Sequence, residues 1–415
     1  MGFFMGKTPK KLKLYIINQD KLVIPYGLKS FILNLLNTRG ISYQVNEEHV
    51  LNELNIDTNE DITLYDYQLE AIEKIKNETN GILISPCGSG KTMMALSLIK
   101  ELPYKTLWIT HTQDLLNQSY RSAKRLYNNS LGKITEGKVD IGDITFATIQ
   151  TLCKVDLNAI KDEFTMIIVD ECHKATGTPS KLKMFYSVID KLNAKYKFGV
   201  TATLFDKPND ISSTPIFLIG DKLHEIDENK IKRIKASHDV VPLSTPKSDT
   251  YLKSDRTLDY MKLVDYLVYN IDRNVEIVKN LINYSNKYNI ILSNRNDHLD
   301  LIGMLLESYG MEFKILTADC KKKERELILE DFRQGKIRYL LSNYQLFKEG
   351  VDVPIADTLH LVFPLNDKTT IIQSAGRVER LYEGKTHSQV VDYVDYNIPY
   401  CERLYKERKR ILKWR

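Results

Sequence analysis

The chain of 415 residues is predicted to be an α/β protein, with two parallel-sheet domains in tandem after a small N-terminal α+β module. Three observations predict this fold class. Short apolar runs alternate with helical stretches, which is typical of parallel sheets covered by helices on both faces. The pattern occurs twice, on either side of a polar stretch at residues 206–265. Only the first half carries a glycine-rich loop ending in Gly-Lys-Thr, so we expect one nucleotide at a cleft between two domains.

Residues 1–60 are expected to form the small module. It begins with a basic arm, because residues 1–13 contain four lysines and no acid. The expected elements are two strands around an Asn-Gln-Asp turn, a helix and a third strand, over residues 12–18, 21–25, 28–36 and 41–45. Such a short segment buries little apolar surface by itself, so we expect it to dock on the neighbouring domain.

The two larger domains are expected at residues 61–205 and 266–400, with residues 206–265 as the inter-domain connection. In the first domain, an amphipathic helix from Tyr65 through Lys76 precedes the sheet. The apolar runs predict strands at residues 81–85, 106–110, 144–148, 165–170 and 197–201 in the first domain, and at 289–293, 313–316, 338–342, 358–363 and 388–394 in the second.

Residues 401–415 are expected to form a basic C-terminal tail. They contain seven basic and two acidic residues, so their net charge equals the +5 of the whole chain. A basic terminal helix can follow a phosphate backbone, or it can be a solvated, frayed end. The residues alone leave both readings open.

The composition is typical of a soluble globular protein, with 43% apolar and 27% charged residues. No apolar run approaches the roughly 18 residues that span a bilayer, and the first residues do not form a signal peptide. The five cysteines lack C-x-x-C spacing, so we expect reduced thiols rather than disulfides or a zinc site. We therefore expect an intracellular protein with no membrane partner, cytoplasmic in a bacterial or viral host cell or associated with the nucleoid.

A strand at residues 81–85 runs into a phosphate-binding loop, or P-loop. It matches G-x-x-x-x-G-K-[ST] except that Ser85 replaces the first glycine, and its further residues are Pro86, Cys87, Gly88, Ser89, Gly90, Lys91 and Thr92. Backbone N–H groups of such a loop turn onto phosphate oxygens, and the following helix adds its positive dipole end. Lys91 is expected to reach the β- and γ-phosphates and Thr92 to hold Mg²⁺, so ATP and Mg²⁺ are the expected cofactors.

The apolar strand that begins at residue 165 ends in two carboxylates, Asp170 and Glu171. Ligands gather at the carboxyl ends of parallel strands, so both side chains are expected near the P-loop. Asp170 is predicted to complete the Mg²⁺ site with Thr92. Glu171 is the candidate for orienting or deprotonating the attacking water.

The segment Asp170-Glu171-Cys172-His173 resembles the acidic box of superfamily 2 helicases of the DExH type, with His173 as a further catalytic residue. The resemblance implies two RecA-like domains. It also assigns nucleotide contacts to four residues. Tyr65 and Gln68 belong to a motif that recognises adenine, with Gln68 as the residue that reads the base, and the other two are Gly350 and Asp352. The nucleic-acid contacts that it implies are His111, Thr112, Gln113, Thr148, Gln150, Thr201 and Thr203 in the first domain, and Ser293, Asn294, Ser342 and Asn343 in the second.

The run from Gln373 to Arg380 matches the helicase motif Q-x-x-G-R-x-x-R. ATP hydrolysis needs positive charge on the γ-phosphoryl group, and arginines supplied this way accelerate other nucleotide hydrolases by roughly 10³–10⁵. Arg377 and Arg380 are therefore predicted catalytic residues, and the resemblance to the motif adds Gln373. The spacing of three predicts that Arg377 and Arg380 lie on one face of a helix.

Within the superfamily, the chain resembles the branch of XPB-like and phage UvsW-type DNA helicases, where the small N-terminal module is associated with DNA. This implies an ATP-dependent DNA helicase or translocase, expected as a monomer, that unwinds or branch-migrates duplex, forked or branched DNA in recombination, repair or replication. An RNA helicase and the motor subunit of a restriction or remodelling assembly are the alternatives. A non-catalytic ATP-dependent clamp is disfavoured by Lys91, Asp170, Glu171 and Arg377.

Overall fold

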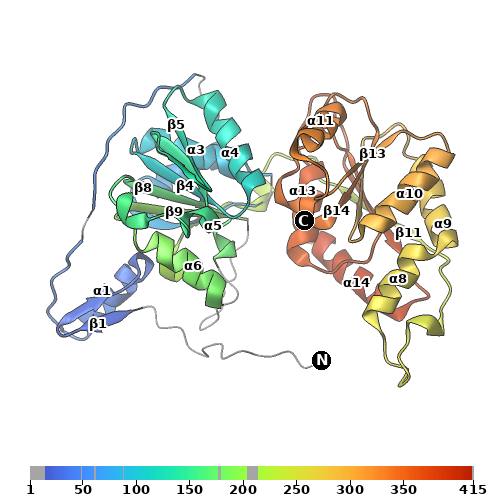
Figure 1. Cartoon of the computed structure of the whole chain (residues 1–415), viewed down its shortest axis with the longest axis horizontal. Helices are drawn as coiled ribbons and strands as arrows, with labels where there is room; N and C mark the ends of the chain where they lie inside the picture. Colours follow the sequence, from blue (N-terminus) through green and yellow to red (C-terminus); the bar gives the residue numbers. More distant parts are fainter. Residues whose placement is uncertain are drawn as a thin grey trace. The chain divides into compact units, whose positions relative to one another are not determined.

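The computed structural model describes residues 15–413, apart from residues 48, 60–61, 87, 176–178 and 203–213. The chain divides into two units, Met1–Ile231 and Lys232–Arg415, and each has its own sheet with helices on both faces (Figure 1). The predicted α/β class with two parallel sheets is confirmed. The predicted basic arm at residues 1–13 lies outside the described residues.

The sheet of the first unit has the strand order β10-β3-β9-β8-β4-β7-β5-β6, and all neighbours are parallel except the edge pair β5–β6. Its strands are β3 (Asn80–Ile84), β4 (Thr106–Thr110), β5 (Leu131–Thr135), β6 (Lys138–Asp140), β7 (Ile144–Thr148), β8 (Met166–Asp170), β9 (Tyr196–Thr201) and β10 (Lys222–Glu225). The five predicted strands are confirmed as β3, β4, β7, β8 and β9. Strands β5, β6 and β10 are not among the predicted runs because they lie toward the sheet edges and carry many polar residues.

Successive residues of a strand face opposite sides of a sheet, so the first unit has two apolar cores. Leu83 and Ile168 pack with α2, α3 and α4 on one face. Ile82 and Val169 pack with α5, α6 and α7 on the other. The helices are α2 (Asp66–Ile75), α3 (Lys91–Glu101), α4 (Gln113–Leu126), α5 (Ile149–Leu152), α6 (Pro179–Ile189) and α7 (Thr214–Leu218).

The N-terminal module contains β1 (Ile16–Asn18), β2 (Lys21–Val23), the 3₁₀ turn η1 (Tyr26–Leu28) and α1 (Lys29–Thr38). The predicted hairpin and helix are confirmed, but the third strand predicted over residues 41–45 is wrong, because these exposed residues form no strand. Turn η1 packs tightly on α7, since a Cβ at Gly27 would come within 2.3 Å of the Ile216 carbonyl oxygen.

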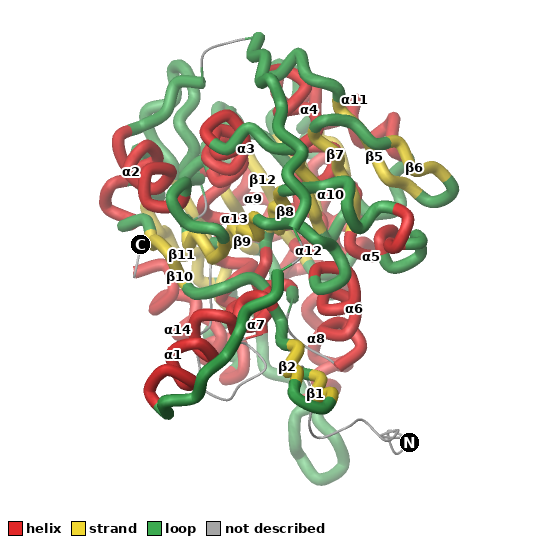
Figure 2. The backbone as a smooth tube through the Cα atoms, turned by 90° about the vertical axis from the view of Figure 1, so that its left-hand side faces the viewer, coloured by secondary structure: helices red, strands yellow, loops and turns green. Residues whose placement is uncertain are grey.

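Between α1 and α2 the chain crosses the first unit as a long loop (Figures 1 and 2). Asn52 shows where this loop lies. Its N–H donates to the Thr165 hydroxyl at 2.7 Å, and its carbonyl accepts from the N–H of Lys105 at 2.9 Å. Thr165 and Lys105 directly precede β8 and β4, so the loop borders the amino-terminal ends of these strands.

The sheet of the second unit is entirely parallel, with the strand order β11-β16-β15-β12-β14-β13. Its strands are β11 (Ser237–Pro242), β12 (Asn289–Ser293), β13 (Phe313–Leu316), β14 (Tyr339–Asn343), β15 (Thr358–Leu361) and β16 (Gln389–Val394). Its helices are α8 (Tyr260–Tyr269), α9 (Ile271–Ile282), α10 (Asn296–Ser308), α11 (Lys322–Arg333), α12 (Tyr344–Gly350), α13 (Lys368–Val378) and α14 (Pro399–Lys413). Across the described part of the chain, no helix combines the length and apolarity needed to cross a membrane.

Two stretches carry more structure than the sequence indicates. Residues 206–265, expected as a connection, supply β10 to the first sheet and β11 to the second. The basic C-terminal residues belong to α14 as far as Lys413. Within α14, the buried Arg408 donates from Nε and Nη2 to the Asp392 carboxylate of β16 at 2.8–3.1 Å. Arg408 therefore anchors the helix to the sheet and is not available to a phosphate backbone.

Candidate active site

The P-loop occupies the turn between β3 and α3. Gly88 and Gly90 have φ angles of 81° and 83°, in the left-handed region that residues with a Cβ rarely adopt. The hydroxyl and the N–H of Ser89 both donate to the Pro86 carbonyl, at 2.6 and 3.2 Å. Ser85, at the position of the usual first glycine, hydrogen-bonds through its hydroxyl to that of Ser89. The replacement therefore adds a contact that supports the loop.

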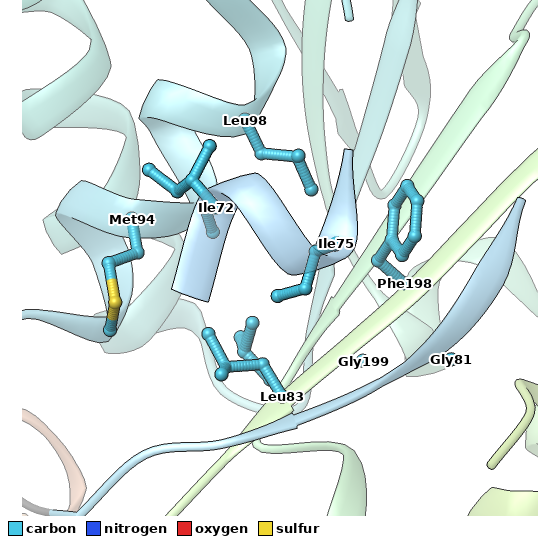
Figure 3. A pocket seen from close by; sticks show the side chains of 10 residues that line it. Ile72, Ile75, Gly81, Leu83, Met94, Leu98, Phe198 and Gly199 are labelled. Carbon is cyan, nitrogen blue, oxygen red and sulfur yellow. The ribbon is translucent and has the colours of Figure 1, made fainter. Parts of the chain in front are cut away.

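Gln68, predicted to read adenine, lies on α2 and is buried against the P-loop. Its Oε1 accepts from the N–H of Tyr65 at 2.9 Å, and its Nε2 donates to the Ser89 carbonyl at 2.7 Å. A Cβ at Gly90 would come within 2.4 Å of the same Nε2, so glycine also leaves room for Gln68. The hydrogen bond from Gln68 to Ser89 therefore connects the predicted adenine reader to the predicted phosphate loop. Close to this contact, apolar side chains of α2 and α3 face each other around a small apolar cavity (Figure 3).

Lys91, Asp170 and Glu171 lie together at the carboxyl end of the first sheet. The Nζ atom of Lys91 is 3.7 Å from Oε1 of Glu171 and 3.4 Å from the Ser85 carbonyl oxygen. Asp170 ends β8, is buried, and accepts the N–H of Glu171 at 2.9 Å. Glu171 has a φ of 50°, a left-handed conformation that costs a residue with a Cβ on the order of 1–3 kcal/mol and clusters at active sites.

The two carboxylates have opposite pKa shifts. Burial raises the pKa of Asp170 to about 7, and the charge of Glu171 adds to this increase. Burial also favours a higher pKa for Glu171, but the Lys91 ammonium and the hydrogen bond with His173 outweigh it, so the pKa of Glu171 is lowered overall. A carboxylate with a lowered pKa suits orienting a water molecule better than removing its proton. Asp170 is the carboxylate that a nearby cation would stabilise most.

His173 connects the acidic pair to the end of β9. Its Nδ1 lies 3.2 Å from Oε2 of Glu171 and 2.8 Å from the hydroxyl oxygen of Thr201. Thr201 is the last residue of β9 and is fully buried. The structure therefore brings a predicted catalytic residue, His173, into contact with Thr201, which was predicted to contact nucleic acid.

The other predicted nucleic-acid contacts of the first unit follow two neighbouring strands, β4 and β7. Thr112 and Thr148 accept from the backbone N–H groups at the starts of α4 and α5, at 3.4 and 3.3 Å. Gln150 donates from Nε2 to the His111 carbonyl at 3.0 Å, which joins the two loops. Gln113 and Gln150 are exposed. The five predicted residues therefore share one edge of the sheet, where exposed amides are available to a ligand.

The second unit repeats this arrangement at the ends of β12 and β14, where Ser293 pairs with Asn343 in register. The hydroxyls of Ser293 and Ser342 are buried and bond to His298 Nδ1 at 2.8 Å and to the Leu316 carbonyl. Asn343 accepts the N–H of Leu346 at 2.9 Å and so begins α12. Of the four predicted contacts, Asn294 is exposed and Asn343 half-buried. The two serines instead shape the strand ends from inside.

The two predicted catalytic arginines reach adjacent residues of one segment. Arg377 donates from Nη1 to the Val351 carbonyl at 2.6 Å, and Arg380 forms an ion pair with the Asp352 carboxylate. The expectation that both arginines lie on one helix is wrong, because α13 ends at Val378. Gln373 lies inside α13 and is half-buried, and Gly350 is the last residue of α12. The predicted nucleotide contact Asp352 thus pairs with the predicted catalytic Arg380.

The residues at the P-loop fit a nucleotide with Mg²⁺. The left-handed turns at Gly88 and Gly90 let the backbone approach phosphate oxygens, and Thr92 stands in the first turn of α3. Thr92 and the buried Asp170 would hold Mg²⁺, which supplies charge neutralisation to the phosphates when bound. In the described ranges, no group of three His, Cys, Asp or Glu side chains is placed to hold a metal ion. The predicted contacts Cys87 and Thr203 lie outside the described residues.

Two contacts at these sites come from residues that were not predicted. The Tyr67 hydroxyl donates to the Ser89 carbonyl at 3.2 Å, and Arg333 of α11 donates from Nε to the Asp352 carbonyl at 2.8 Å. Tyr67 stands inside the Tyr65–Gln68 motif, which could have identified it. Arg333 has no such signal, because its helix has the ordinary charge pattern of an exposed helix.

Comparisons with known proteins agree with both halves of this description. Residues 61–206 match the family model described as "Type III restriction enzyme, res subunit", and residues 273–382 match "Helicase conserved C-terminal domain". The Pyrococcus furiosus Hef helicase domain has a similar fold, with a TM-score of 0.56 at 17% identity over 83% of this chain and 97% of that chain. The two sheet units are thus RecA-like helicase domains in fold.

Three relatives illustrate the sequence similarity. The chain is 27% identical over 372 residues to the DNA 3'-5' translocase XPB2 of Sulfurisphaera tokodaii, across 80% of this chain and 82% of that protein. It is 24% identical over 431 residues to the ATP-dependent DNA helicase uvsW of Enterobacteria phage T4, across 95% and 83%. It is 25% identical over 372 residues to the putative ATP-dependent helicase IRC3 of Saccharomyces cerevisiae, across 80% of this chain and 51% of the yeast protein, so the matched region is about half of that relative.

The two family models cover the segments that hold the P-loop with its acidic pair and the arginine motif, in the same order along the chain. The archaeal and phage relatives extend the similarity over most of the sequence. Residues 61–206 and 273–382 therefore carry the two domains of a superfamily 2 helicase, an ATP-hydrolysing enzyme, and the sequence is similar to the XPB-like and phage UvsW-type proteins of that superfamily.

Proposed function

We propose that this chain is an ATP-dependent DNA translocase that unwinds or branch-migrates forked and branched DNA in recombination, repair or replication. One observation carries the proposal: His173 contacts both Glu171 and Thr201. This contact connects the residue expected to orient water with a strand end expected to respond to nucleic acid. The relatives named as a DNA translocase and a DNA helicase support DNA as the substrate.

In the proposed cycle, Lys91 binds the β- and γ-phosphates of ATP and Glu171 orients the attacking water. Arg377 and Arg380 of the second unit stabilise the charge that develops on the γ-phosphoryl group, an effect worth roughly 10³–10⁵ in rate in other nucleotide hydrolases. Domain closure around ATP and reopening after hydrolysis alternate the grip of the two units on one DNA strand.

The proposed DNA contacts go mainly to the phosphate backbone, through residues such as Gln113, Gln150 and Asn294, which are exposed at strand ends. Backbone contacts position a protein without reading bases, so binding is weakly sequence-specific and falls steeply with salt. We propose that the chain acts as a monomer in the cytoplasm or at the nucleoid, and the phage relatives support an intracellular site.

The test measures ATP hydrolysis by the full chain with single-stranded DNA, duplex DNA and RNA, and then unwinding of forks, four-way junctions and duplexes with 3' or 5' tails. DNA should stimulate hydrolysis more than RNA, and forks or junctions should be unwound faster than blunt duplexes. Lys91→Ala, purified in the same way, is the control, because any unwinding that remains in this variant comes from contaminating helicases. Stronger stimulation by RNA would make the chain an RNA helicase.

The motor subunit of a restriction or remodelling assembly is the second candidate, because the first family model is named for a restriction subunit. The two candidates differ in what the chain does alone. An autonomous helicase separates strands without a partner, whereas a motor subunit hydrolyses ATP on duplex DNA and leaves the strands paired. The unwinding panel distinguishes these outcomes.

A further inference from the structure

Glu379 lies between the two arginines of the second unit and is buried. Its side chain is 4% exposed, at the point where α13 has just ended. A carboxylate at such a position requires partners, because burying an unpaired charge is costly. Its partners come from a distant part of the chain.

These partners are residues 233–236, the segment through which the chain enters the second unit just after Ile231. Nη1 of Arg233 lies 3.4 Å from Oε2 of Glu379, and the Arg233 side chain is also 4% exposed. The N–H of Ala236 donates to Oε1 of Glu379 at 3.2 Å, and the N–H of Ile234 donates to the Glu379 carbonyl at 3.0 Å. One residue therefore binds the entering segment by side chain and backbone together.

The backbone carbonyls on either side of Glu379 also accept hydrogen bonds. Nζ of Lys385 donates to the carbonyls of Val378 and Arg380, the latter at 3.1 Å, and also to that of Ala356 at 2.6 Å. The hydroxyl of Ser388 donates to the Val378 carbonyl at 2.8 Å. Each carbonyl from residue 378 to residue 380 thus accepts a hydrogen bond. Because the backbone of this turn is held at every residue, a displacement of the entering segment should move the turn with it.

We propose that Glu379 is a positioning residue that ties the entering segment, residues 233–236, to Arg377 and Arg380, so that the position of this segment sets the position of the two arginines. A buried ion pair adds little net stability over an apolar pair of similar volume, and its main effect here is to fix one geometry. The inference rests on the proposed role of the two arginines in ATP hydrolysis. The inference gives a function to residue 379, which is one of the variable positions of the motif Q-x-x-G-R-x-x-R.

The test uses steady-state ATP hydrolysis by the full chain with saturating DNA, at a temperature where circular dichroism shows each variant folded. Glu379→Gln keeps an acceptor for the Ala236 N–H but removes the charge, and Arg233→Met removes the guanidinium. Each should lower kcat by about 10- to 100-fold, the cost of a small displacement of a catalytic group, and leave KM for ATP nearly unchanged. The double variant should be no slower than the slower single variant, and Arg233→Lys should retain most of the activity.

Two further variants separate the possible failures. Arg273→Met removes a buried arginine of the same unit whose partners, Asp395 and the Val362 carbonyl, lie outside the arginine turn, so its folded form should keep its kcat. Arg377→Ala should abolish hydrolysis. If Glu379→Gln and Arg233→Met keep their kcat while Arg377→Ala is inactive, this inference alone is overturned. The inference is also overturned if Arg273→Met loses as much kcat as these two variants. Normal hydrolysis in Arg377→Ala overturns the proposed role of the arginine itself.

Discussion

The imidazole Nδ1 of His173 lies 2.8 Å from the hydroxyl oxygen of Thr201, and the same nitrogen lies 3.2 Å from the Glu171 carboxylate. We predict that His173→Ala loses a larger share of the DNA-stimulated ATP hydrolysis than of the basal hydrolysis. Coupling through such contacts is worth about 0.5–2 kcal/mol, so stimulation should fall roughly 2- to 30-fold. Thr201→Val removes the same contact from the other side and should act alike. Full stimulation in both variants would remove this contact from the coupling mechanism.

Lys91→Ala is expected to abolish ATP turnover, because the Lys91 ammonium next to Glu171 is the charge that the P-loop offers to the phosphates. The measurement is phosphate release with and without DNA. Lys100→Ala, on the last turn of the same helix, is the matched control and should be active. Turnover close to that of the parent in Lys91→Ala would refute the P-loop assignment.

Glu171→Gln is expected to bind ATP and hold it unhydrolysed. The substitution leaves Lys91 and Asp170 in place and removes the carboxylate that orients water, so hydrolysis should fall by about 10²–10⁴-fold while ATP affinity is retained. Nucleotide retained on the protein after gel filtration, separated into ATP and ADP, is the measurement. Loss of ATP binding in this variant would show that Glu171 supports the loop rather than the chemical step.

Arg408→Met is expected to destabilise the second unit strongly, whereas Lys409→Met should have little effect. Removing one partner of a buried ion pair costs about 3–5 kcal/mol, and Asp392 in β16 would lose the guanidinium that it pairs with. Lys409 is the next residue of α14 and is exposed. Urea unfolding followed by hydrogen exchange in β16 compares the two. Equal stability would mean that α14 contributes as a surface helix only.

Acid should weaken the second unit through its buried histidines. Burial lowers the pKa of His298 and of His360 to about 3, from the ordinary value near 6.5. Between these values the unfolded chain binds protons that the folded chain does not, so each histidine removes about 1.4 kcal/mol of stability per pH unit as the pH falls below 6.5. Hydrogen exchange of β12 and β15 at pH 7.5 and 5.5 measures the loss.

His298→Gln should reduce this pH dependence by the share of one histidine, although the variant itself is less stable at neutral pH. His387→Gln is the control, because the His387 side chain is 41% exposed. If the pH dependence is the same in all three proteins, carboxylates rather than buried histidines govern acid unfolding.

The central strands of both sheets could be predicted because strands buried on both faces are continuous apolar runs, as in Met166–Asp170. Among the edge strands, Phe313–Leu316 could be predicted from its apolar run, whereas Lys222–Glu225 and Ser237–Pro242 could not, because they are partly exposed and polar. The strand predicted at residues 41–45 shows the converse. Its apolar alternation favours a strand, but a strand forms only where another segment pairs with it.

The candidate site divides in the same way. Lys91, Asp170 and Glu171 follow strands in short motifs, so their meeting at one sheet edge could be predicted from topology. The contact of Arg233 with Glu379 could not, because it joins positions far apart in sequence, and neither position carries a motif signal. The ion pair of Arg380 with Asp352 likewise depends on where α13 ends, and helix ends are the part of a helix that sequence indicates least well.

Strand β10 bears on how this protein can be divided for separate study. It covers the open side of β3, the strand that carries the P-loop, yet it lies beyond residue 206, where the match to the first family model stops. A recombinant piece ending there would leave the backbone N–H and C=O groups along one side of β3 unpaired, and such bare edges recruit other chains into aggregates. A soluble ATP-binding half should therefore be cut after Ile231, where the first unit ends.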